Sequence, residues 1–132
     1  MANLSIVQKD AFAKLAGIEI IDVQPGRAKM KMPIGPQHLN GLGVVQGGAI
    51  FTLADLGFAA AVNSHGFDSV AVNVSISYLK AAKSGTLYAD AQEASPHGKL
   101  GTCTVRVTDD AGDLVAIFQG LSYRKGPPSP KP

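Results

Sequence analysis

The chain has 132 residues, a formal net charge of +2 and one cysteine. This length predicts one domain with a substantial core, whose larger functional surfaces usually need a second subunit. Because the charges are spread along the chain and Cys103 stands alone, the composition excludes a nucleic-acid footprint, an internal disulfide and a multi-cysteine metal site.

The first segment predicts a short amphipathic helix over residues 5–16. Ser5 is in position for an N-cap, Gln8 for a capping box and Gly17 for a helix stop. The apolar residues of this helix lie among polar neighbours and are Ile6, Val7, Phe12 and Leu15. Polar residues this close to the start are not typical of a secretory signal, and a lone cysteine favours a reducing compartment. We therefore expect a soluble, cytoplasmic protein.

Residues 18–32 predict a hairpin of two strands. The first strand is rich in β-branched residues and ends at the turn dipeptide Pro25-Gly26, and the second alternates apolar with basic residues. Residues 33–48 then hold two prolines and five glycines, which predicts an irregular loop. Loops this long within a compact domain tend to be functional.

A helix that starts near Gly48 is the most apolar part of the chain. As far as Val62 its only polar side chains are Thr52 and Asp55, so nearly every face must be buried. The run has about 15 residues, short of the roughly 20 that span a bilayer, which predicts a core helix. An unpaired buried carboxylate costs several kcal/mol, so Asp55 needs partners, a raised pKa or a task.

Four strand-like runs follow, at residues 70–78, 87–92, 102–108 and 114–123. Because strands and helices do not alternate, we expect an α+β domain. It has an antiparallel six-stranded sheet wrapped around one long central helix, with a short N-terminal helix. We place the domain over residues 1–125 and a disordered, proline-rich tail over residues 126–132. The open sheet edges predict a homodimer. We further expect two such dimers to associate into a homotetramer.

Gly47 and Gly48 lie where the loop becomes the helix. The first amides of a helix have no internal partner and can hold an anion or a developing oxyanion, although the glycines can equally serve the turn alone. Gly48 and Asp55 are seven residues apart, roughly 10 Å along one axis. A reacting carbonyl needs both its oxyanion donor and its attacking group within about 3 Å. If the two residues act together, they come from two subunits.

The run HLNGLGVVQGGAIFTLAD, residues 38–55, resembles the signature of the hotdog-fold acyl-CoA thioesterases, especially the phenylacetyl-CoA thioesterase type. In that type an H-x-N loop and a Gly-Gly helix start are followed two turns later by Ala-Asp. Residues 74–85 are similar to the family's strand that ends in a basic residue and a turn, and the resemblance covers roughly residues 15–125.

The resemblance implies a role for each residue of this signature. Asp55 is the nucleophile or the general base, the amide of Gly47 or Gly48 polarises the thioester carbonyl, and Asn40 of the facing subunit helps hold the water or carboxylate. The family usually has His at position 46. Gln46 can donate a hydrogen bond but cannot carry a proton near neutral pH, so carbonyl activation is expected to be weaker and the acid–base work falls on Asp55.

Other residues are candidates for substrate binding. Lys80 and Lys83 lie where the family receives the CoA phosphates, and Arg124 can join them, but lysines in turns are often only solvated. His38 either orients the loop or contacts the ligand. The residues expected to bound an acyl pocket are Phe51, Leu53, Phe58 and Tyr78. Cys103 alternates onto the apolar side of its strand and is interpreted as a core residue.

We therefore predict a thioesterase that hydrolyses a medium-chain or aryl acyl-CoA. It needs no metal and no cofactor, since coenzyme A is part of the substrate. One alternative is a non-catalytic dimer that binds acyl-CoA or another ligand, prompted by Gln46. The other is a dehydratase or hydratase of the same fold. Such enzymes pair a His with an acid, and this helix has no His beside Asp55.

Overall fold

The computed structural model describes residues 4–94 and 98–128. Its helices are α1 (Ser5–Gln8), α2 (Ala11–Ala16) and α3 (Gly47–Val62), with a 3-10 turn η1 (Pro36–His38) before α3. Its strands are β1 (Glu19–Gln24), β2 (Arg27–Pro33), β3 (Phe67–Tyr78), β4 (Thr86–Glu93), β5 (Leu100–Thr108) and β6 (Leu114–Pro128).

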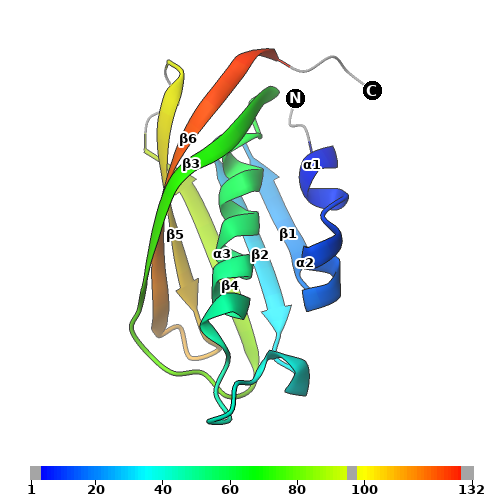
Figure 1. The fold of residues 1–132 in the computed structure, drawn as a ribbon, viewed down its shortest axis with the longest axis vertical. Helices are drawn as coiled ribbons and strands as arrows, with labels where there is room; N and C mark the ends of the chain where they lie inside the picture. Colours follow the sequence, from blue (N-terminus) through cyan, green and yellow to red (C-terminus); the bar gives the residue numbers. More distant parts are fainter. Residues whose placement is uncertain (1–3, 95–97, 129–132) are drawn as a thin grey trace.

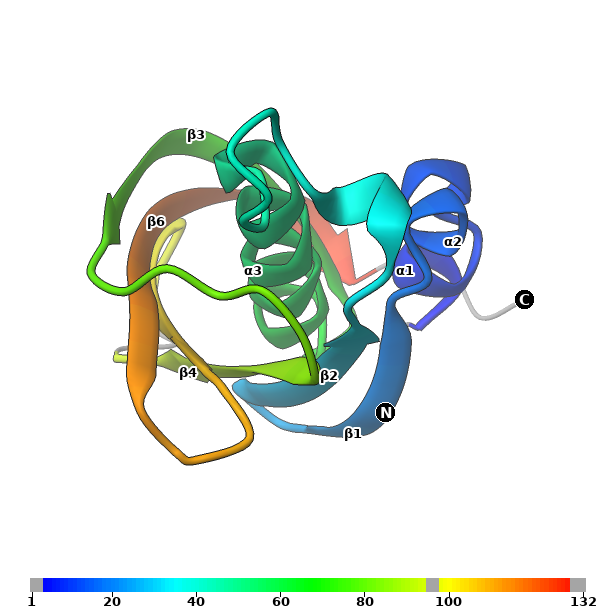
Figure 2. The same cartoon turned by 90° about the horizontal axis from the view of Figure 1, so that it is seen from below.

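The strands form one antiparallel sheet of six strands in the order β1-β2-β4-β5-β6-β3. Figure 1 shows α3 lying lengthwise against this sheet, with α1 and α2 beside it. Seen along α3, the sheet curves around the helix (Figure 2). The predicted α+β architecture and the strand count are confirmed, and β1 and β3 are the two edges.

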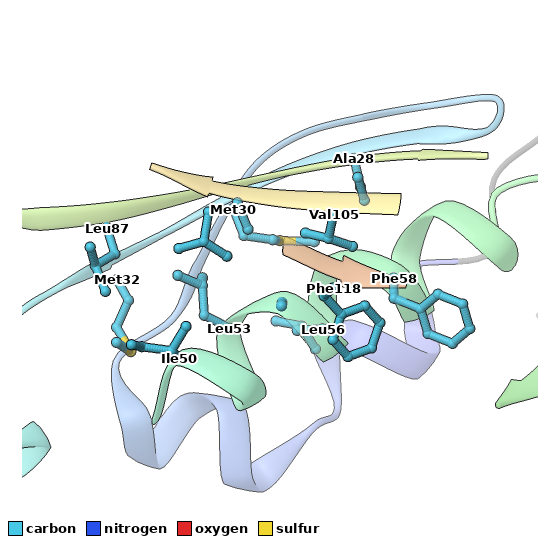
Figure 3. Packing of buried hydrophobic residues seen from close by; sticks show 14 of the residues in the cluster. Ala28, Met30, Met32, Ile50, Leu53, Leu56, Phe58, Leu87, Val105 and Phe118 are labelled. Carbon is cyan, nitrogen blue, oxygen red and sulfur yellow. The ribbon is translucent and has the colours of Figure 1, made fainter. Parts of the chain in front are cut away.

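The core lies between α3 and the concave face of the sheet. Alternate residues of β2, β4 and β5 point inward, as the period of two requires, and Met30 and Met32 of β2 are fully buried. Leu53 of α3 is also fully buried, and Figure 3 shows the α3 side chains directed at those of the sheet. Full burial of one such side chain contributes roughly 1.5–3 kcal/mol. This packing fixes the position of α3.

An aromatic cluster sets the spacing between α3 and β6. The rings of Phe51 and Phe58 pack against Phe118, with centroids 5.4 and 5.6 Å apart. Gly120 leaves room for Phe58, because a Cβ at position 120 would collide with that ring.

Cys103 is likewise buried, and burial together with the charge of Glu93 raises the pKa of its thiol to about 12. The prediction of a core cysteine is confirmed.

The amino-terminal segment differs from the predicted single helix. It forms two short helices, because the Asp10 side chain accepts a hydrogen bond from the Ala13 amide (2.9 Å) and caps a new helix. Ser5 is not an N-cap, since α1 starts after Leu4 with no side-chain cap. Gly17 ends α2 in the left-handed conformation, as predicted, with φ of 79°.

The last strand is longer than predicted. β6 continues to Pro128, and Pro128 pairs with Phe67, so residues 126–128 belong to the sheet rather than to a tail. The rest of the predicted tail, residues 129–132, lies outside the described residues. Within residues 4–94 and 98–128, no helix is both long and apolar enough to cross a membrane.

We expect Gly120→Ala to lower the free energy of unfolding by about 1–3 kcal/mol, because the added methyl group overpacks the ring of Phe58. Urea denaturation measures the change. The double variant Gly120→Ala/Phe58→Leu should lose less than the sum of the two single variants, since the smaller side chain makes room for the methyl group. Strictly additive losses would contradict the contact.

Candidate active site

Asp55 is half-buried on α3, between the buried residues Ala54 and Leu56. No hydrogen-bond or ion-pair partner of its carboxyl group lies in the described part of the chain. Burial raises the pKa of this carboxyl above its ordinary value, and the negative charge of Asp10 raises it further. The sequence places an ionisable carboxyl group on an apolar helix. In the structure the burial of that group is accompanied by a raised pKa.

A cavity of about 720 Å³ opens between α2, the loop that contains η1, and the start of α3. It is lined by Phe12, Leu15 and Ala16 of α2, by residues 37–40, and by Gln46, Gly48, Ala49 and Thr52. Asp55 is not a lining residue, but it follows Thr52 by three residues and Gly48 by seven, which places all three on one face of α3. The cavity and the carboxylate therefore share a helix face.

His38 fastens the loop to α2. It is buried, its Nδ1 accepts a hydrogen bond from the Gly35 amide (2.9 Å), and its Nε2 lies 2.7 Å from the Ala16 carbonyl oxygen. Because an amide N–H can only donate, Nδ1 is the acceptor and Nε2–H is the donor. Both ring nitrogens are thus engaged by the backbone, so His38 offers the cavity only the carbon edge of its ring.

Asn40 shapes the turn that follows. Its Oδ1 accepts hydrogen bonds from the amides of Leu42 (2.9 Å) and Val44 (3.3 Å), and its own amide donates to the Val44 carbonyl (2.8 Å). This side chain therefore orders a tight loop. Its Nδ2 group has no hydrogen-bond acceptor among the described residues. Asn40 also lines the cavity, which leaves a donor available there.

Gln46 caps α3. Its Oε1 accepts from the Gly48 amide at 3.0 Å, so that amide is engaged within the chain. The Gly47 amide, by contrast, meets no acceptor among the described residues. The Gly47 carbonyl accepts a hydrogen bond from the Tyr78 hydroxyl (2.9 Å), and the Gly48 carbonyl accepts one from Thr52 Oγ1 (2.7 Å). The free donors at the helix start are therefore the Gly47 amide and the Nε2 group of Gln46.

The three predicted phosphate-binding residues have different surroundings. Lys80 Nζ lies 2.7 Å from both Asp109 and Asp113, and these hydrogen bonds raise the pKa of Lys80. The Arg124 guanidinium lies over the Phe67 ring, 4.9 Å from its centroid. Lys83 is exposed and has no acidic partner among the described residues.

Across residues 4–94 and 98–128, no group of three His, Cys, Asp or Glu side chains is placed to hold a metal ion.

The predicted acyl-pocket residues do not gather around the cavity. Leu53 and Phe58 are buried in the core, and Phe51 packs on Phe118. Tyr78 instead helps line a second hollow of about 410 Å³ on the other side of the α3 start, together with Lys80.

Sequence reasoning missed Phe12, Leu15, Thr52 and Asp10 as neighbours of the site. Phe12 and Leu15 have the spacing of an amphipathic helix and were predicted only as its apolar positions. Nothing local in the sequence brings Asp10 near Asp55, because 44 residues, 11–54, lie between them. Thr52 had a local signal, since it is the only other polar side chain on the apolar helix.

The family model described as the thioesterase superfamily matches residues 42–116, which include the helix start and Asp55. The chain belongs to the thioesterase superfamily. It has the hotdog fold of this superfamily and is a hydrolase that acts on thioester bonds.

Three similar proteins show how far the similarity extends. A putative esterase of Archaeoglobus fulgidus is 41% identical over 89% of this chain and 77% of its own length. The Escherichia coli acyl-coenzyme A thioesterase PaaI is 37% identical over 92% of this chain and 88% of its own, and its solved structure superposes with a TM-score of 0.89 over 94% and 91% of the two chains. A hypothetical thioesterase of Streptococcus pneumoniae, solved with coenzyme A, is 26% identical, with a TM-score of 0.88 over 96% and 100% of the chains.

We expect Asp55→Asn to raise the melting temperature near neutral pH. The raised pKa means that the folded state binds more protons than the unfolded state between the ordinary and the raised pKa, so stability falls as pH rises through that window. The amide removes this penalty. Thermal unfolding at several pH values measures the gain, which should shrink below about pH 4, where the wild-type carboxyl is protonated in both states.

The matched control for this comparison is Asp22→Asn, which changes an exposed carboxylate on β1. It should leave the melting temperature nearly unchanged at neutral pH. An Asp55→Asn protein that is no more stable than the wild type at any pH would contradict the raised pKa.

Proposed function

We propose that this thioesterase hydrolyses a medium-chain or aryl acyl-CoA to the free acid and CoA. The observation that carries the proposal is Asp55, a half-buried carboxylate with a raised pKa on the helix face that borders a largely apolar cavity. The similarity to a protein named acyl-coenzyme A thioesterase, and to one solved with coenzyme A, supports this substrate class. That the former belongs to the phenylacetic acid degradation operon supports an aryl acyl group.

Asp55 supplies the attack on the thioester carbonyl. Its raised pKa makes the carboxylate a stronger base than an ordinary Asp, which suits the removal of a proton from water. The same carboxylate can instead attack the carbonyl directly and form an anhydride. Single turnover in heavy-oxygen water separates the two routes, because direct attack first places an oxygen of the enzyme in the product.

The carbonyl oxygen is polarised at the start of α3. The Gly47 amide has no other acceptor among the described residues and carries the positive end of the helix dipole. The Gly48 amide donates a hydrogen bond to Gln46 Oε1. This contact leaves the Nε2 group of Gln46 as a second donor. In this role Gln46 orients the thioester without transferring a proton.

The reacting groups come from two subunits. Gly47 and Asp55 are eight residues apart on one helix, about 12 Å along its axis, so a carbonyl cannot contact both in one chain. A homodimer that brings Asp55 of one chain to the Gly47 amide of the other satisfies both contacts. Asn40 Nδ2 then donates to the water or the leaving carboxylate across the same interface.

The edge strand β3 is the surface that we propose for this dimer. Its Val70 and Val72 are 44% and 53% exposed, which is unusual for an unpaired edge. Pairing of β3 with β3 of a second copy covers both residues. In this dimer Lys83 and Arg124 bind the CoA phosphates. Lys80 is not assigned this role, because two aspartates already balance its charge.

We expect Asp55→Asn to lower kcat/KM for acyl-CoA hydrolysis on the order of 10²–10⁴-fold, because general base or nucleophilic catalysis is lost. Release of the free CoA thiol measures turnover with acetyl-, hexanoyl-, decanoyl-, phenylacetyl- and benzoyl-CoA. Asp22→Asn is the control and should turn over like the wild type. Full turnover by Asp55→Asn would overturn the assignment.

A non-catalytic acyl-CoA-binding dimer is the second candidate, because Gln46 occupies the Gly48 amide that would otherwise meet an oxyanion. The same assay decides between the two. Tight binding of acyl-CoA by the wild type with no thiol release from any substrate would favour the binding protein.

We expect Val70→Lys/Val72→Lys to separate the subunits and to lower turnover, because charged side chains on an edge strand oppose pairing. Analytical ultracentrifugation measures the mass in solution. Ile21→Lys places one lysine on an exposed apolar position of the other edge strand, β1, and should leave the dimer intact. A dimer that survives in the β3 variant would exclude this interface.

A further inference from the structure

The helix α2 keeps its two largest apolar side chains out of the core. Phe12 is 64% exposed and Leu15 is 78% exposed, whereas Ala13, on another face of the helix, is buried. Phe12 and Leu15 are three residues apart and so lie on one face. An apolar pair left exposed together on a short helix needs an occupant, because contiguous apolar surface in water marks a binding site more often than chance.

Both side chains line the 720 Å³ cavity, opposite Ala49 and Thr52 of α3. The same cavity reaches Gln46 and Gly48, the residues at the start of the helix that carries Asp55. Its volume lies within the range of about 300–1,000 Å³ that is typical of small-molecule sites. The apolar wall of α2 is therefore continuous with Gln46 and Asn40, two of the groups to which the reaction is assigned.

This wall is held in place at both ends of α2. At its start Asp10 caps the Ala13 amide, and at its end Gly17 takes the left-handed conformation. His38 adds a hydrogen bond to the Ala16 carbonyl oxygen, 2.7 Å away, which ties α2 to the loop on the opposite side of the cavity. The wall is thus preformed, and a ligand gains from it without first having to order it.

We propose that Phe12 and Leu15 form the acyl-binding wall and make the enzyme prefer acyl groups of about six carbons or more, or an aryl group, over acetyl. The inference rests on the proposed function. A hydrophobic acyl chain is the occupant because it is the apolar part of the substrate and is joined directly to the reacting carbonyl. Each methylene group that is buried there raises kcat/KM about fourfold.

The test is the ratio of kcat/KM for hexanoyl-CoA to that for acetyl-CoA, with phenylacetyl-CoA as the aryl probe. In Phe12→Ala/Leu15→Ala we expect this ratio to fall about tenfold or more, because the longer chain loses its contacts with α2. Leu100→Ala is the matched control: it truncates an exposed leucine on β5 that does not line the cavity, and it should leave the ratio unchanged.

A second variant probes the same wall by filling it. Leu15→Trp narrows the cavity and should lower kcat/KM for decanoyl-CoA more than for hexanoyl-CoA. An unchanged ratio in the alanine variant and no chain-length effect of the tryptophan would overturn the proposal. Dissociation of the dimer in either variant would also overturn it, since the wall would then be a subunit contact. Absence of turnover in the wild type would instead refute the proposed function.

Discussion

The contact between Phe58 on α3 and Gly120 on β6 lets the central helix approach the sheet closely, because a Cβ at position 120 would collide with the ring. The helix is apolar on nearly every face, so its position depends mainly on packing. Gly120 admits the Phe58 ring, so this contact adds to the core packing that sets the position of the helix. The same position decides which residues remain at the surface, and it leaves Gly48, Thr52 and Asp55 on the face that borders the cavity.

His38 gives the other half of the site its shape. One imidazole ring joins the end of α2 to the loop before α3, so the two walls of the cavity are held by a single buried side chain. Asn40 then orders the loop tip, and Gln46 ends it by capping the helix. Polar side chains that the sequence suggests for chemistry therefore spend part of their hydrogen-bonding capacity on structure. What remains for a ligand is the Nδ2 group of Asn40 and the Nε2 group of Gln46.

The fold was predictable because its signals are local. The hairpin over residues 18–32, the apolar helix and the later strands each have a period and turn residues that identify them without knowledge of the rest. The N-terminal helix was predicted less well, since Asp10 inside it starts a second helix. In the site, Asp55 was found as the one charge on an apolar helix. The engagement of Lys80 by two aspartates and the exposure of Phe12 depend on contacts between distant segments, which no local pattern reports.

The two edges of the sheet differ in a way that limits its growth. The edge strand β1 has six residues, an irregular register between Ile20 and Asp22, and a charged residue, Glu19, near Lys31. Such features oppose the addition of another strand, whereas the twelve-residue β3 carries exposed valines. A sheet that pairs β3 with β3 has a protected β1 at each end. Assembly by that route stops at two chains, whereas bare edges on both sides would let chains add without end into a fibre.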